Sequence, residues 1–287
     1  METNENNVQE QPAPPQLYDP AEAAHIAELL RHAYNPEYII LFGTLVGGTP
    51  HSDIVAYDLL VVPSEEPYYG GWAAAKRWLK LKMPSKHRQI GYVNPHIYTR
   101  NFIDGHSSPV FYLAKKEGVV LYFRKHINLP KPKPYNFAAA RDDASGYFST
   151  FYNLGTQFLD DAGTAFTTND LRQTAFFLAQ AAQLFYRTLF FVYHRFETDC
   201  ENLELLHDML RTLSAELMLQ FDTDHHNGNN TIPRLNAFLN KARYDANFCA
   251  SPRELEAHLD RMEKMKTIIE KVCKQRIELY CSRIVTE

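Results

Sequence analysis

The residues with the clearest chemical potential lie in one short stretch, residues 41–62, which reads LFGTLVGGTPHSDIVAYDLLVV. Transfer of a nucleotide needs a tight turn that brings backbone N–H groups and a hydroxyl close to a triphosphate. It also needs carboxylates that hold divalent metal ions beside the reacting phosphate. The stretch therefore predicts a nucleotide-binding turn at Gly43, Thr44 and Gly48, with Asp58 as a metal ligand.

The spacing of the carboxylates leaves such a site incomplete. Successive side chains of a strand alternate between faces, so two metal ligands on one face stand two residues apart. The position two residues before Asp58 is Ala56, which has no carboxylate. Asp53 lies five residues before Asp58, and this odd separation places it on the opposite face unless a bulge intervenes or the strand starts after it. Asp53 and Asp58 are thus the two candidate catalytic residues.

Two groups of motifs resemble a pair of known domain families. LFGT followed by SDIVAYDLLVV resembles the signature of minimal nucleotidyltransferase domains, where a Gly-Ser turn precedes an acid-x-acid strand and a third acid follows on a neighbouring strand. AFFLAQAAQLFYRTL, LHDML and KARYDANF resemble the HEPN domain that often accompanies them. The resemblance implies an α+β nucleotidyltransferase-like domain with a mixed sheet, then an all-α HEPN-like helical bundle. It also implies Mg2+ and a nucleoside triphosphate as ligands, and a link to toxin–antitoxin systems.

The chain departs from the nucleotidyltransferase pattern at the positions on which nucleotide transfer would depend. Ala56 replaces the first acid, while Thr44 replaces the usual serine and keeps its hydroxyl. Gly47 stands where these domains often have a phosphate-facing arginine. The third acid is expected in GYVNPHIYT, which offers only Asn94 and His96. These two residues could hold one metal ion, but histidine favours zinc-like ions over magnesium. We therefore expect a degenerate transferase site.

The helical half carries residues that HEPN nucleases would use. Such nucleases pair an arginine with a histidine four to six residues apart, and Arg187 and His194 have six residues between them. His207 lies in the LHDML motif, and Arg243 lies in a later helix that has no matching histidine. Together these four residues form a candidate HEPN groove. The simpler interpretation of each is a structural or solvated side chain in a bundle.

Three functions follow from these observations. The leading one is a nucleotide-binding protein without transfer activity, whose helical bundle mediates dimerisation and contact with a protein or RNA partner. The alternative is an active metal-dependent nucleotidyltransferase that uses Asp53 and Asp58 and adds a nucleotide to a small molecule, an RNA or a protein. A weaker alternative is a HEPN ribonuclease. The plainest interpretation of residues 41–62 is a glycine turn between two core strands, with Asp58 in a salt bridge.

Composition narrows the class of protein. The 287 residues carry a formal net charge of −4, which gives no electrostatic basis for coating DNA. The four cysteines form no CxxC pair, which disfavours a zinc knuckle or a disulfide framework. Neither a signal-peptide pattern nor an apolar run of about 18 residues is evident, so we expect a cytoplasmic protein without a membrane span.

The elements that position these residues divide the chain in two. We expect a disordered tail over residues 1–18, the nucleotidyltransferase-like domain over 19–126, a Pro- and Lys-marked linker over 127–134 and the bundle over 135–287. The first part should contain a helix capped by Asp19, strands at 37–42, 57–62 and 88–99, a helix at 72–83, and a helix followed by a strand within 108–125.

The helical half should contain long amphipathic helices. The sequence predicts a helix within 169–196, a second over 202–217, a loop over 222–231, and a last helix that begins with the capping sequence Ser251-Pro252-Arg253-Glu254.

Overall fold

A computed structural model describes residues 17–65, a few positions between 75 and 82, and residues 92–129, 131–221 and 230–286. Three predictions lie mostly or wholly outside the described residues. They are the tail over 1–18, the helix over 72–83 and the loop over 222–231, which includes an acidic and histidine-rich group at 222–226.

The first half is a mixed sheet of four strands in the order β3-β2-β1-β4. β1 pairs antiparallel with both β2 and β4, whereas β2 pairs parallel with β3. The bounds of the strands are β1 Pro36–Phe42, β2 Ala56–Pro63, β3 Tyr92–Ile97 and β4 Val119–Phe123. Its helical segments are α1 Pro20–Tyr34, the 3-10 turn η1 Thr44–Val46, α3 Arg100–Gly105 and α4 Pro109–Glu117. The predicted mixed α+β half is confirmed.

Helix α1 begins where its capping residues predict. The Asp19 carboxylate accepts a hydrogen bond from the Ala21 N–H at 2.8 Å, and Pro20 occupies the first turn. Asn35 ends the helix in the left-handed conformation, with φ of 43°. Glu22, in the first turn of the helix, accepts a hydrogen bond from the buried Tyr57 hydroxyl at 2.6 Å. This bond joins α1 to strand β2.

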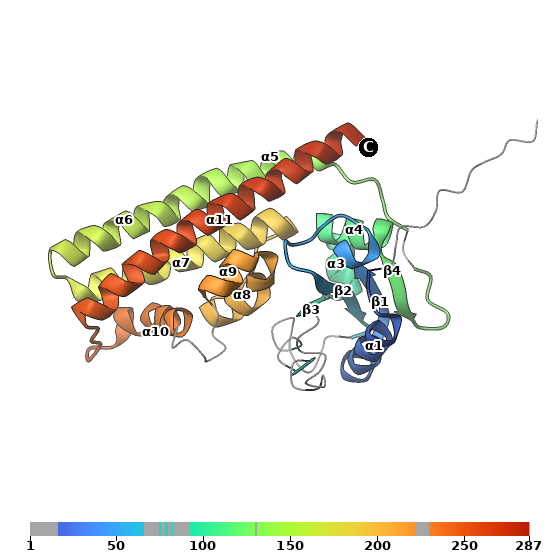
Figure 1. Cartoon of the computed structure of the whole chain (residues 1–287), viewed down its shortest axis with the longest axis horizontal. Coiled ribbons are helices and arrows are strands. Elements are labelled where there is room, and N and C mark those ends of the chain that lie inside the picture. The colour runs from blue at the N-terminus through green and yellow to red at the C-terminus, as the bar shows by residue number, and fades with distance from the viewer. Residues whose placement is uncertain are drawn as a thin grey trace, which may run out of the picture.

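The second half is helical (Figure 1). Its segments are α5 Phe137–Tyr147, the π-helical turn η2 Phe148–Tyr152, α6 Asn153–Thr167, α7 Leu171–His194, α8 Leu203–Leu210, the 3-10 turn η3 Arg211–Leu213, α9 Ala215–Gln220, α10 Thr231–Tyr244 and α11 Pro252–Thr286. Helix α7 contacts α5, α6, α8, α10 and α11, so it forms the centre of this half. By length and hydropathy α7 alone among the described helices could cross a membrane, yet 61% of its most apolar window is buried inside the molecule, as in a bundle core.

The prediction of a single helix over residues 202–217 is wrong. The chain instead forms α8, the 3-10 turn η3 and α9, with a break at Ser214, whose backbone is extended. The Ser214 hydroxyl accepts a hydrogen bond from the Leu217 N–H and caps α9. Thr212, inside the break, donates a hydrogen bond to the first half. A contact with a distant part of the chain therefore overrides the local helical pattern.

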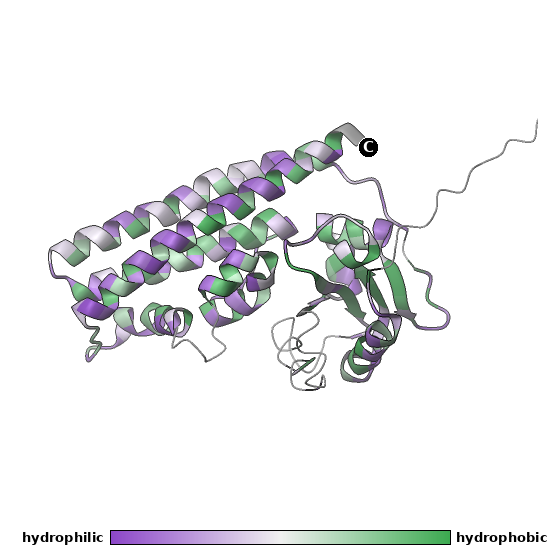
Figure 2. Ribbon diagram, in the orientation of Figure 1, coloured by the Kyte–Doolittle hydropathy of each residue, from purple (hydrophilic) through white to green (hydrophobic). Residues whose placement is uncertain are grey.

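The two faces of the sheet have different neighbours. On one face Ile39, Leu41 and Val61 pack in a cluster with α1. On the other face Tyr38, Ile40 and Leu60 belong to the same apolar cluster as α4 and the helical half. Figure 2 shows hydrophobic residues along the strands and an alternation of hydrophobic and hydrophilic residues along α11. Because Asp58 lies two residues before Leu60, it shares the face that meets the helical half.

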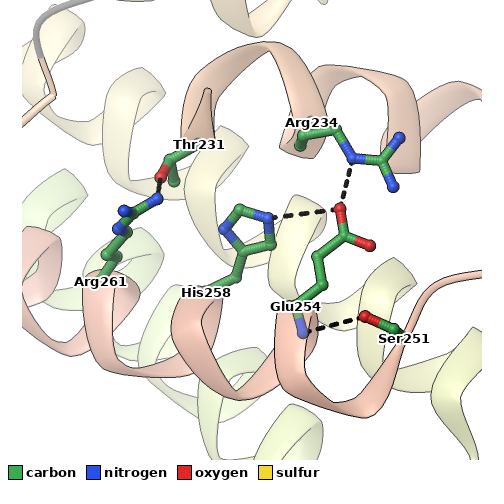
Figure 3. A network of polar contacts seen from close by, with 6 residues as sticks. All are labelled: Thr231, Arg234, Ser251, Glu254, His258 and Arg261. Atoms are coloured by element: carbon green, nitrogen blue, oxygen red, sulfur yellow. Dashed lines mark hydrogen bonds and ion pairs between the residues drawn. The ribbon is translucent and has the colours of Figure 1, made fainter. Parts of the chain in front are cut away.

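A polar network joins α10 to the start of α11 (Figure 3). The Glu254 carboxylate accepts a hydrogen bond from Arg234 and lies 3.9 Å from His258 Nε2. The Glu254 backbone N–H donates a hydrogen bond to the Ser251 hydroxyl. Burial lowers the pKa of His258 to about 4, because the Glu254 charge offsets desolvation only in part and Arg261 and Arg234 lower it further. His258 is therefore neutral in the folded protein at neutral pH.

This network predicts a loss of stability in acid. The unfolded chain protonates His258 near pH 6.5, whereas the folded chain does so near pH 4, so the stabilisation is complete above pH 6.5 and is lost as the pH falls toward 4. This difference between the pKa of His258 in the folded and the unfolded chain corresponds to at most about 3 kcal/mol of the free energy of unfolding. In thermal melts from pH 7.5 to 4.5, His258→Gln should show a weaker fall in Tm than wild type. His32→Gln, at an exposed histidine, is the control; equal slopes for all three proteins would contradict the assignment.

Candidate functional site

Asp58 lies in a buried chain of hydrogen bonds that crosses from one half to the other. It faces Asn94 in the parallel register of β2 and β3, and the Asn94 amide donates to Asp58 Oδ1 at 2.9 Å. The Thr212 hydroxyl donates to Asn94 Oδ1 at 2.8 Å. Asp58 is 1% exposed, and so is Asn94. The neighbouring strand thus places a neutral amide where a third carboxylate would be needed, and the helical half closes over it.

Asp53 is held by the helical half rather than by a metal site. Strand β2 starts at Ala56, after Asp53, so the strand itself does not force Asp53 onto the opposite face. The Asp53 carboxylate nevertheless accepts a hydrogen bond at 2.6 Å from the Ala215 N–H, the first residue of α9. Within the part of the chain that the structure describes, no group of three potential metal ligands contains Asp53 or Asp58.

The predicted nucleotide-binding turn is largely bonded to itself. Gly43 has φ of 82°, and a Cβ on it would lie 3.0 Å from Asp58 Oδ2, so both the backbone and the carboxylate require glycine here. The N–H groups of Val46 and Gly48 donate to the Gly43 carbonyl, and the Gly47 N–H donates to Thr44. Three backbone donors that could face a phosphate are therefore engaged within the turn.

A groove of about 490 Å³ lies between this turn and the end of α11. It is lined by Val46, Gly47, Gly48, Thr49, Pro50, Glu117, Leu279 and Arg283. The Thr49 N–H and hydroxyl donate to Glu117 Oε2 at 2.6 and 2.7 Å, and Arg283 pairs with Glu117 Oε1 at 2.8 Å. Two donors of Thr49 in the loop and the Arg283 guanidinium of α11 thus hold the Glu117 carboxylate. Sequence reasoning identified Gly48 here but missed Glu117 and Arg283, because neither belongs to a motif.

Three buried histidines meet beside the junction of the two halves. His51 precedes β2, His96 lies in β3 and His194 ends α7; they are 3%, 0% and 0% exposed. One nitrogen from each ring lies within 4.8 Å of the others. The His194 Nδ1 makes a 2.9 Å hydrogen bond with the Phe190 carbonyl. Burial lowers the pKa of His194 to about 3, which the Phe190 carbonyl partly offsets and the Arg276 charge reinforces. The sequence pointed to His96 as a metal ligand but missed His51.

The four candidate HEPN residues do not share one environment. His194 belongs to the buried histidine cluster, and His207, 1% exposed, makes a 2.8 Å hydrogen bond with the Tyr186 hydroxyl. Arg187 is half-buried on α7. Arg243 is exposed at the end of α10 and lies over the Phe176 ring, 5.3 Å from its centroid. Neither histidine is accessible to an RNA 2′-hydroxyl in this structure, which does not favour ribonuclease chemistry.

No family model matches the chain, and no curated protein has significant sequence similarity to it. The resemblance to nucleotidyltransferase and HEPN domains therefore rests on the motifs and on the order of the two halves.

The Asp58 environment predicts the effect of placing a second acid beside it. Asn94→Asp would place two carboxylates in hydrogen-bond contact inside the protein, where like charges repel strongly. We expect it to lower the free energy of unfolding by about 3 kcal/mol at pH 7, with partial recovery at pH 5 as one carboxylate is protonated. Thr212→Val, which removes only the hydroxyl, should cost about 1 kcal/mol. Urea titrations measure both; an Asn94→Asp protein as stable as wild type, or stabilised by Mg2+, would contradict the enclosed site.

Proposed function

We propose that this protein binds a nucleotide and does not transfer it. The observation that carries this proposal is the burial of Asp58 beneath the helical half, with Asn94 in place of a second acid. Nucleotide transfer needs cations that contact both the attacking and the leaving oxygen, and one enclosed carboxylate does not provide their ligands. The second predicted carboxylate, Asp53, caps α9 instead.

The groove beside Gly48 is the site we propose for the nucleotide. Its volume of about 490 Å³ lies within the range of small-molecule pockets. Arg283 supplies a cation at this groove, whereas Gly47, another lining residue, stands where nucleotidyltransferase domains often have arginine. Glu117 now occupies the donors of Thr49, so a phosphate group would replace or displace this carboxylate. Thr44 and Gly43 shape the turn and need not contact the ligand.

We assign the helical half a role in association. Pairing with a second copy, or with a protein or RNA partner, follows from the resemblance to HEPN domains. The same resemblance is the basis for a link to toxin–antitoxin systems. In this proposal the helical half also acts as a fixed cover over the sheet, since Thr212 bonds to Asn94 in β3 and the N-terminus of α9 bonds to Asp53 in the loop before β2.

Nucleotide binding predicts stabilisation without product. At a nucleotide concentration of about 100 Kd, ATP with Mg2+ should add about 2.7 kcal/mol to the free energy of unfolding, seen as a rise in Tm. Arg283→Gln should abolish most of that rise, whereas Arg253→Gln, the same change at the opposite end of α11, should retain it. Labelled ATP should give neither labelled protein nor released pyrophosphate. No shift with any of the four nucleoside triphosphates would remove the binding proposal, and pyrophosphate release would establish a transferase.

The position of Glu117 predicts a second, opposite effect. Glu117→Gln removes a negative charge from the groove while it keeps the side chain's size, so a phosphate meets less repulsion. We expect nucleotide affinity to rise about fivefold, equal to about 1 kcal/mol. Calorimetric titration of wild type and Glu117→Gln with ATP measures the change. Equal or weaker binding by the variant would place the nucleotide elsewhere.

A further inference from the structure

We propose that His51, His96 and His194 bind one divalent cation of the zinc class, and that this cation joins the two halves of the chain. The three side chains come from the loop before β2, from β3 and from the last residue of α7. Two ligands thus belong to the sheet half and one belongs to the helical half. The site is separate from the nucleotide groove, whose lining residues include none of the three histidines.

The geometry of the cluster is close to that of a metal site. The three ligand nitrogens lie within 4.8 Å of one another. Zinc binds histidine nitrogen at about 2.0–2.1 Å, which in a tetrahedral site separates two nitrogens by about 3.4 Å. Ring movements of about 1 Å would therefore bring all three onto one cation. Imidazole suits zinc, copper and nickel, whereas magnesium prefers oxygen ligands, so the donor set selects the zinc class.

The surroundings of His194 prepare it for a metal. A carbonyl only accepts hydrogen bonds, so the bond to the Phe190 carbonyl requires the proton to be on Nδ1. Nε2 then carries the lone pair. A backbone carbonyl behind a histidine is a common support for metal ligands, because it fixes both the tautomer and the orientation of the ring.

Charged groups near the cluster are of both signs. Asp58 Oδ2 and His51 Cβ both lie within 3.7 Å of the point where a Cβ on Gly43 would be, so the carboxylate is near His51, and its charge offsets part of a dication's charge there. Arg276 opposes this effect. Its guanidinium is, however, directed to the Pro50 carbonyl and to the Tyr193 and Tyr280 rings. The carboxylate therefore provides local charge compensation for a cation.

The competing explanation is that the three rings simply pack as neutral aromatic groups. His51 makes an edge-to-face contact with His96, with centroids 4.9 Å apart; Phe42 contacts both rings and Tyr193 contacts His51. Such packing would need no ligand and would be insensitive to metal. The two explanations therefore differ in metal content and in the effect of metal on stability.

Metal binding to the full chain decides between them. We expect elemental analysis and Zn2+ titration of chelator-treated protein to give one equivalent per chain, with a rise in Tm, in the absence of nucleotide. Co2+ should give the visible absorption bands of a nitrogen-ligated site in the unaltered protein, which requires no folded variant. His51→Gln should lower Zn2+ affinity by more than about 100-fold. His258→Gln, the same change at a buried histidine outside the cluster, should leave it unchanged.

Three results would overturn the proposal. The first is a folded wild-type protein that takes up no Zn2+ and shows no Co2+ bands. The second is His51→Gln binding that equals wild type. The third is an equal loss in His258→Gln, which would place the metal elsewhere. The metal site and the nucleotide groove share no residue, so each proposal can fail by itself. Zn2+ binding without nucleotide binding would contradict only the proposed function, and nucleotide binding without Zn2+ binding would contradict only the metal site.

Discussion

The burial of Asp58 between the two halves is the constraint on which the rest of the structure depends. A carboxylate removed from water must be neutralised or hydrogen-bonded, or it destabilises the fold. Here the Asn94 amide supplies a hydrogen bond and the Thr212 hydroxyl holds that amide, so residues of both halves solvate one acid. Thr212 lies in the 3-10 turn between α8 and α9, so the segment that separates these helices also contacts the sheet half. In this arrangement Asp58 is 1% exposed.

Polar groups in and around residues 43–58 bond to one another and to the helical half. Asp53 caps α9, Glu117 occupies the donors of Thr49, and Arg283 at the end of α11 pairs with Glu117. The first two contacts use Asp53 and the Thr49 backbone donor, which belong to residues 43–58. The third, between Arg283 and Glu117, involves the carboxylate that Thr49 binds. The histidine cluster lies at the same junction, with ligands from both sides. One face of the sheet therefore packs against the helical half, and a groove lies between the turn at Gly47 and Gly48 and the end of α11.

Local signals in the sequence predicted much of the fold. Asp19 and Ser251 cap helices where expected, the apolar runs at 37–42 and 57–62 are neighbouring strands, and the absence of a third acid opposite Asp58 was evident from Asn94. These features depend on residues close together in the sequence or on strand alternation. The misses depend on long-range contacts: the break at Ser214, the Glu117 carboxylate on Thr49, and the meeting of His51 with His194. No local pattern encodes those distances. His194 was assigned to an RNA groove because spacing on one helix says nothing about what covers it.

The most direct test of this account is an experimentally determined structure of the protein with a non-hydrolysable ATP analogue and Mg2+. The account predicts the phosphates in the groove between Gly48 and Arg283, with the Asn94–Asp58 hydrogen bond intact and the helical half still in contact through Thr212. Phosphates beside Asp58 with Mg2+ on its carboxylate, and the helical half displaced from the sheet, would contradict it. That result would make the enclosed state a closed form of an active enzyme.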